Sequence, residues 1–185
     1  MMITDATLNT TAMQRFGLIE KVLLCGALVS ASLLIGAHIF EYLGYAPCAL
    51  CLDQREAHWT ALTITVIGLV ISFLFKVPRL AAAATGTAAL VYGFSAALAF
   101  YHTGIEFSFW PGPASCTGIG NIGDAGNLSL DFDPDIPRVS CTNAAWRLFG
   151  ISMAGYNLLL SAGLFALTFF AATHALRKAK REKRV

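Results

Sequence analysis

Four long stretches without a charged residue constrain this chain more than any other feature of its sequence. The runs 22–40 and 57–75 each hold nineteen uncharged residues, while 80–105 and 148–176 hold 26 and 29. A membrane-spanning helix needs about 20 apolar residues, and four buried soluble helices of this kind would leave no polar face for water. The sequence therefore predicts an all-α membrane protein.

The whole chain, 1–185, reads as a single membrane domain built as a four-helix transmembrane bundle. Charged residues make up 13% of it, about half the share of an average soluble domain. We expect spans at approximately 20–41, 57–76, 80–105 and 148–176. The external loop between the third and fourth spans, 106–147, has 42 residues, and a loop of that length usually carries function or is disordered.

The first apolar run has a second interpretation, as a cleaved signal peptide. It exceeds the roughly 7–15 residues of a signal-peptide core, and no small-x-small cleavage site follows it. A lipoprotein-type cleavage before Cys48 is disfavoured because Pro47 stands where a small residue is needed. We therefore expect the first span to be retained.

The distribution of Lys and Arg predicts the orientation of the bundle. Ten of the thirteen basic residues precede the first span, connect the second to the third, or follow the fourth. By the positive-inside rule, both termini are cytoplasmic and the long loop is on the opposite side. The net charge of +2 is too small to indicate a nucleic-acid partner, and we expect none. The ten residues are Arg15, Lys21, Lys76, Arg79, Arg177, Lys178, Lys180, Arg181, Lys183 and Arg184.

This topology sorts the five cysteines. Cys48 and Cys51 form a Cys-x-x-Cys pair at the start of the second span, and Cys116 and Cys141 lie in the long loop. Four thiols therefore face an oxidising compartment, where two disulfides are available. Cys25 lies inside the first span, where apolar surroundings leave a thiol neutral and unreactive, so we expect a core residue.

The Cys48–Cys51 pair is interpreted as a redox-active dithiol. A helix N-terminus nearby offers unpaired N–H groups and partial positive charge, which stabilise a thiolate. Arg55 follows Cys51 by four residues and therefore lies one turn along the same helical face. A zinc half-site or a structural loop is the alternative for such a pair. Zinc would need two further ligands and no second Cys-x-x-Cys exists, so we expect no metal.

The loop cysteines leave two interpretations open. A disulfide between Cys116 and Cys141 would close 26 residues and would stabilise the fold by about 3 kcal/mol through loop entropy alone. That pair by itself does not favour chemistry over bracing, so a non-catalytic membrane protein remains an alternative. Two dithiol pairs on one face favour chemistry, because adjacent pairs can exchange. A transmembrane thiol carrier is disfavoured because both pairs lie outside the spans.

The four histidines suggest a different class of protein, a di-haem carrier of the cytochrome b561 type with paired axial ligands. By topology His38, His58 and His102 lie towards the external side and His174 towards the internal one. This leaves no clean internal pair, so haem is disfavoured. We expect His38, His58 and His174 to be interfacial.

Taken together, several motifs give the chain a resemblance to a known family. They are PCALCLDQR at 47–55, YHTGIE at 101–106, PGPASC at 111–116, and Cys141 followed by WRLFGISM at 146–153. In their order, and with four spans, they resemble the DsbB family of quinone-dependent disulfide-generating proteins of the bacterial inner membrane. The similarity covers most of the chain.

The resemblance implies a reaction and a location. A reduced, periplasmic thioredoxin-fold oxidase of the DsbA type would be reoxidised at the loop pair, with Cys116 forming the mixed disulfide and Cys141 as its mate. Cys48 and Cys51 would pass the electrons to ubiquinone or menaquinone, with Cys51 nearest the ring as thiolate adduct or charge-transfer partner. The location would be the inner membrane, with cytoplasmic termini and periplasmic cysteine pairs.

The resemblance also implies a quinone site. Arg55 would stabilise charge there, His102 matches the family's quinone-site histidine, and Leu98 and Met153 match positions that line the pocket. Glu106 stands where the family pattern has a glutamine. A carboxylate there would supply protons or face water, and the sequence leaves its role open.

Overall fold

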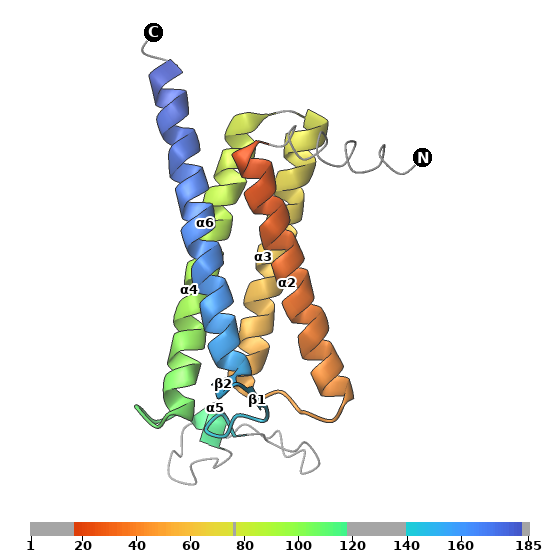
Figure 1. Ribbon diagram of the computed structural model, residues 1–185, viewed down its shortest axis with the longest axis vertical. Helices are drawn as coiled ribbons and strands as arrows, with labels where there is room; N and C mark the ends of the chain where they lie inside the picture. The colour runs from red at the N-terminus through yellow and green to blue at the C-terminus, as the bar shows by residue number, and fades with distance from the viewer. Residues whose placement is uncertain (1–16, 76, 118–139, 183–185) are drawn as a thin grey trace, which may run out of the picture.

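The computed structural model describes residues 17–75, 77–117 and 140–182. Four long helices lie side by side, with the small elements gathered at one end (Figure 1). This confirms the predicted four-helix bundle, and all four helices are long and apolar enough to cross a membrane. The elements are α2 (Leu18–Tyr42), α3 (Ala49–Val70) with its π-helical extension η1 (Ile71–Phe75), α4 (Pro78–Glu106), α5 (Ala114–Thr117), β1 (Arg147–Leu148), β2 (Ile151–Ser152) and α6 (Met153–Glu182).

The observed helices differ from the expected spans chiefly at the start of α3 and at both ends of α6, which ends at Glu182 rather than at 176. α3 begins at Ala49, eight residues before the expected start at 57, because Cys48 caps it and its first turns are polar. α6 begins at Met153 rather than at 148, because the preceding residues form the β1–β2 hairpin. Its two-residue turn, Phe149–Gly150, has positive φ at both positions, as a tight hairpin turn requires.

Four of the ten basic residues used to predict the orientation lie outside the described residues. They are Arg15, Lys76, Lys183 and Arg184.

The bundle is apolar outside and partly polar inside. Large side chains such as Leu28, Leu90 and Phe94 are exposed on its outer surface, where they suit a lipid environment. Its interior holds buried hydroxyl, amide and imidazole groups alongside small residues that let the helices approach. The buried polar residues include Ser30, Gln54, His58, Thr65, Ser95, His102, Asn157 and Ser161.

Two expectations about single residues are wrong. Cys25 is exposed on the outer surface of α2 rather than buried in the core, because its helical phase turns it away from α3 and α6. His58 is buried between helices rather than interfacial, because the early start of α3 carries it two turns into the bundle. Exposed His38 and His174 lie in the last turns of α2 and in the final third of α6.

Replacing Gly104 by alanine should displace Trp110 and destabilise the protein. A Cβ atom at 104 would overlap the indole ring of Trp110, whose N–H donates to the Tyr101 carbonyl at 2.9 Å. Overpacking of this kind costs about 1–3 kcal/mol, so the thermal unfolding midpoint in detergent should fall. The matched control is Gly163→Ala, whose added Cβ meets no atom within 4 Å. Equal midpoints for the two variants would contradict this prediction.

Candidate functional site

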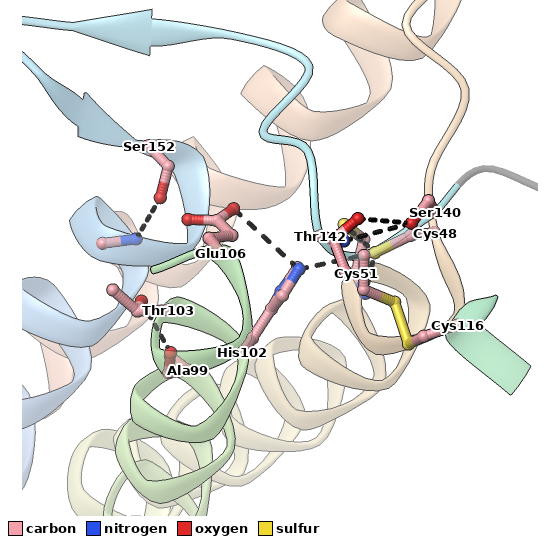
Figure 2. Close-up of polar contacts among 12 residues, drawn as sticks. Cys48, Cys51, Ala99, His102, Thr103, Glu106, Cys116, Ser140, Thr142 and Ser152 are labelled. Atoms are coloured by element: carbon pink, nitrogen blue, oxygen red, sulfur yellow. Dashed lines mark hydrogen bonds and ion pairs between the residues drawn. A yellow bond between two sulfur atoms is a disulfide. The ribbon is translucent and has the colours of Figure 1, made fainter. Parts of the chain in front are cut away.

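All four predicted redox cysteines meet at the hairpin end of the bundle. Cys48 and Cys51 come from the start of α3, Cys116 from α5, and Cys141 from the segment before β1. Cys48, Cys116 and Cys141 are buried with Ile105 in one apolar cluster, and Cys51 packs against it. Figure 2 shows Cys48, Cys51 and Cys116 converging beside the last turns of α4. We call this group the cysteine cluster.

Cys48 and Cys51 are a reduced pair with unequal surroundings. Their Sγ atoms lie 2.7 Å apart, and the Cys51 amide donates to Cys48 Sγ at 3.3 Å. Cys48 is the N-cap of α3 and only 4% exposed. Its hydrogen bond to the Cys51 sulfur, together with burial, raises the pKa of the Cys48 thiol. When the pair loses one proton, Cys48 therefore keeps the other and Cys51 carries the charge.

Cys116 and Cys141 form a disulfide, and this disulfide lies beside the Cys-x-x-Cys pair. Cys48 Sγ, a ring nitrogen of His102 and Cys141 Sγ all lie within 4.8 Å of one another. Cys141 Sγ is already bonded to Cys116, so these three atoms are not a set of metal ligands in this redox state. The arrangement is instead suited to exchange between the two pairs, because thiol–disulfide exchange requires one sulfur to reach another.

His102 and Glu106 lie one turn apart at the end of α4, between the cluster and β2 (Figure 2). The His102 Nε2 atom is 3.7 Å from Cys48 Sγ and 3.9 Å from Glu106 Oε1. The Glu106 side chain is only 4% exposed. Its Oε2 atom has no hydrogen-bond partner within the described residues, so a buried acceptor remains available at this position.

Arg55 lies one turn after Cys51, as the sequence predicted, but it also has a partner there that the sequence did not predict. Its guanidinium forms an ion pair with Glu41 of α2 and donates to the Ala37 carbonyl at 3.0 Å. The ion pair fixes the cation between α2 and α3. One feature of the sequence could have predicted this ion pair. Glu41 is the first charged residue after the apolar run of the first span, and a charge at the end of a span can pair with an opposite charge on the next helix.

A cavity of about 420 Å³ adjoins the cluster. Its lining is mostly apolar, comes chiefly from α2, α3, α6 and the segment before β1, and includes Cys51, Arg55, His102 and Met153. Glu106 also lines it. Leu98 does not: this side chain packs against the cysteine cluster instead.

Sequence reasoning missed two buried amides behind His102. Gln54 donates to His102 Nδ1 at 2.8 Å, and Asn157 of α6 donates to the Gln54 side-chain oxygen at 2.6 Å. The signal was the presence of amide side chains in or beside apolar spans, where polar residues are costly and usually functional.

The fold and the site together define a multi-pass membrane protein that carries a dithiol next to a disulfide. The family model described as "Disulfide bond formation protein DsbB" matches residues 19–171. The chain therefore belongs to the DsbB family, and is a disulfide oxidoreductase by that membership.

A comparison with curated proteins adds one relative. An uncharacterized protein of Rickettsia prowazekii (strain Madrid E) is 28% identical over 165 residues, which cover 86% of this chain and 90% of the relative. No solved structure matches the chain.

In the reduced pair, Cys51 should react with an alkylating agent before Cys48. The raised pKa of Cys48 keeps its thiol protonated at neutral pH, and only a thiolate is a good nucleophile. After a short pulse of iodoacetamide at pH 7, we expect at least tenfold more label on Cys51, as located by peptide fragment masses. Cys48 labelling should increase only at alkaline pH. Equal labelling at pH 7 would contradict the assignment.

Proposed function

We propose that this protein passes electrons from a reduced thioredoxin-fold dithiol protein of the DsbA type to a membrane quinone, and so generates disulfides. One observation carries the proposal: Cys51 and Arg55 line an apolar cavity that directly adjoins two exchange-competent cysteine pairs. A disulfide formed de novo requires a two-electron acceptor, and the cavity, which both Cys48 and Cys51 line, gives such an acceptor access to the pair.

The cavity residues fit ubiquinone or menaquinone. The cavity volume is within the usual range for small-molecule sites, about 300–1,000 Å³, and a mostly apolar lining suits a lipid-soluble ring. The Arg55 cation stands one turn from Cys51, and the unpartnered Glu106 Oε2 supplies a buried polar atom. A quinone would supply a two-electron, two-proton acceptor at this position.

The first step would occur at the loop disulfide. A thiolate of the partner attacks Cys116, breaks its bond to Cys141 and forms a mixed disulfide. The partner's second thiol then releases Cys116, so the partner leaves oxidised and the loop pair becomes a dithiol. Cys116 is fully buried, so this step requires the short α5 to move away from the cluster.

The second step would transfer oxidation between the pairs. Cys141 is the loop sulfur that lies within 4.8 Å of Cys48. Its thiolate attacks Cys48 of an oxidised Cys48–Cys51 pair, and Cys51 leaves as a thiolate. Cys116 then attacks Cys141, which restores the loop disulfide and releases Cys48 as a thiol. The described structure has this redox state, with the loop pair oxidised and the Cys-x-x-Cys pair reduced.

The last step would oxidise the Cys-x-x-Cys pair. Cys48 and Cys51 join in a disulfide, and their two electrons leave through Cys51 towards the cavity. Arg55 stabilises negative charge on Cys51 while the electrons transfer. The Cys48 proton and the proton that Cys51 gave up on ionisation balance the two electrons at the acceptor, so the reaction needs no other oxidant or reductant.

The charges at the far end of the bundle support an inner-membrane location with cytoplasmic termini. α2 begins, α3 ends, α4 begins and α6 ends at the end opposite the cysteine cluster (Figure 1). Lys21, Arg79, Arg177 and Lys178 lie in those terminal turns. By the positive-inside rule this end is cytoplasmic, which leaves the cysteine cluster periplasmic.

The contacts of the histidines disfavour the haem interpretation. An axial ligand needs a ring nitrogen free to bind iron. Both nitrogens of His58 are hydrogen-bonded to side chains, to Asn157 at 2.7 Å and to Ser30 at 3.3 Å. Neither His38 nor His174 is buried, so no buried pair is left with free nitrogens.

A direct test of the second step is to trap it. In a Cys25→Ala background, Cys51→Ser with Cys116→Ser leaves only Cys48 and Cys141, which should form a disulfide spontaneously because their sulfurs are close. The control, Cys48→Ser with Cys116→Ser, leaves Cys51 and Cys141 and should pair less completely. Peptide mapping under non-reducing conditions measures both. A failure of Cys48 and Cys141 to pair would contradict the exchange route.

The proposed function is tested with purified protein, a reduced DsbA-type protein and a soluble quinone. Quinone absorbance should decay with the chain present and should not decay with Cys51→Ser. Arg55→Leu should lower the rate by tenfold or more, because a charge beside the reacting sulfur is lost, while Arg79→Leu, at the opposite end of the bundle, serves as the matched control. Turnover in Cys51→Ser, or a haem Soret band in the purified protein, would overturn the proposal.

A further inference from the structure

A chain of buried hydrogen bonds runs from the middle of the bundle to His102. His58 Nε2 lies 2.7 Å from Asn157 Oδ1, the Asn157 amide donates to Gln54 Oε1 at 2.6 Å, and the Gln54 amide donates to His102 Nδ1 at 2.8 Å. All four side chains are buried. The chain therefore joins α3, α6 and α4 behind the cysteine cluster.

This chain has a fixed direction. The Asn157 NH₂ group donates to the Gln54 oxygen, and the Asn157 oxygen faces His58 and the Ser161 hydroxyl on its other side. The oxygen of Gln54 is thereby occupied, and its own NH₂ group faces His102 Nδ1. An amide NH₂ only donates, so Nδ1 accepts and carries no proton. If the ring were an imidazolium, its Nδ1–H donor would face the N–H donor of the Gln54 amide, and this hydrogen bond would be lost.

Among the described residues, the groups near Nε2 on the other side of the ring can all accept a hydrogen bond from it. Cys48 Sγ lies 3.7 Å away, Glu106 Oε1 lies 3.9 Å away, and the main chain of Cys141 hydrogen-bonds the ring. A neutral histidine whose Nδ1 is an acceptor carries its proton on Nε2. His102 therefore faces Cys48 as a proton donor, and its ring has no free base for the Cys48 thiol.

We propose that Gln54 and Asn157 are positioning residues that prevent His102 from removing the Cys48 proton, so that Cys51 is the thiolate of the reduced pair. This inference rests on the proposed function for its consequence. A Cys48 thiolate would lie within 4.8 Å of Cys141 Sγ and would return electrons to the loop disulfide. A protonated Cys48 does not return electrons in this way. Both cysteines of the pair line the cavity, and the thiolate is then the one at Cys51, one helical turn from Arg55.

Few titratable groups surround His102. They are Cys48 at the N-cap of α3 and Glu106 on α4 itself. The positive charge of Arg147 in β1 attracts the Glu106 carboxylate. Arg55 forms its ion pair with Glu41 and not with His102. The α6 residue in the chain, Asn157, is uncharged. None of these supplies a second donor to Nδ1, so the amide pair decides the position of the ring proton.

Two substitutions should move the His102 proton from Nε2 to Nδ1. Gln54→Glu replaces the NH₂ group by an acceptor, which favours a proton on Nδ1 and frees Nε2 as a base. Asn157→Asp removes the donor to Gln54, so the Gln54 amide turns its oxygen to His102 with the same result. Ser161→Ala is the matched control, because it removes a hydrogen bond from the same network without reversing an amide.

The readout is the rate at which iodoacetamide labels Cys48 between pH 6 and pH 9, in fully reduced, detergent-purified whole protein. At pH 7 we expect Gln54→Glu and Asn157→Asp to raise this rate at least tenfold, because an adjacent histidine base produces thiolate. The rise with pH should also shift to lower pH. Ser161→Ala should stay within twofold of the unmodified protein.

The inference is overturned if both reversing variants label Cys48 no faster than Ser161→Ala. Recovery of the Cys116–Cys141 disulfide on oxidation, and a single species in size-exclusion chromatography, show that each variant folds. If Gln54→Glu does not fold, Asn157→Asp decides the outcome. The carboxylate that it introduces is not next to the His102 ring, because Gln54 lies between them in the hydrogen-bond chain. Labelling needs neither quinone nor partner, so this result is independent of the turnover assay that tests the proposed function.

Discussion

A polar group inside hydrocarbon has no water to bind, so its hydrogen-bond partner must come from the protein. The rest of this structure depends on that constraint. Buried His58, Asn157 and Gln54 bind one another, and Ser30 and Tyr92 extend the contacts to α2 and the middle of α4 at 2.9 Å. Because each bond fixes the rotation of one helix against another, the same contacts that hold the bundle together also aim His102 at the cysteine cluster.

The sequence predicted the parts of this protein that depend on composition along the chain. The four spans follow from the cost of charge in a membrane, and the adjacency of the cysteine pairs follows from the topology. It did not predict parts that depend on contacts between helices. The start of α3 was missed because the polar residues 53–56 lie inside the helix but outside the apolar run that follows them. Cys25 was misplaced because the charge-free run does not say which face of α2 meets its neighbours.

The candidate site separates two tasks that one thiol pair would have to combine. In the proposed function the loop pair reacts with a protein partner, while the Cys-x-x-Cys pair adjoins a cavity of small-molecule size. A single contact region, around Cys48, His102 and Cys141, joins them. Cys48, His102 and Cys141 are all buried, so the proposed exchange between the two pairs would take place away from bulk water. Membership of the DsbB family agrees with this arrangement.

The position of Cys48 at the very edge of α3 has a mechanical consequence. Its main chain is extended, with φ −80° and ψ 171°, so its Cα atom can shift at the cost of a few cap contacts. Cys51 lies within the helix, and a comparable shift there would break helical hydrogen bonds. In the proposed exchange, Cys48 is therefore the cysteine that would move between Cys141 and Cys51. Cys51 serves as the fixed terminal beside the cavity.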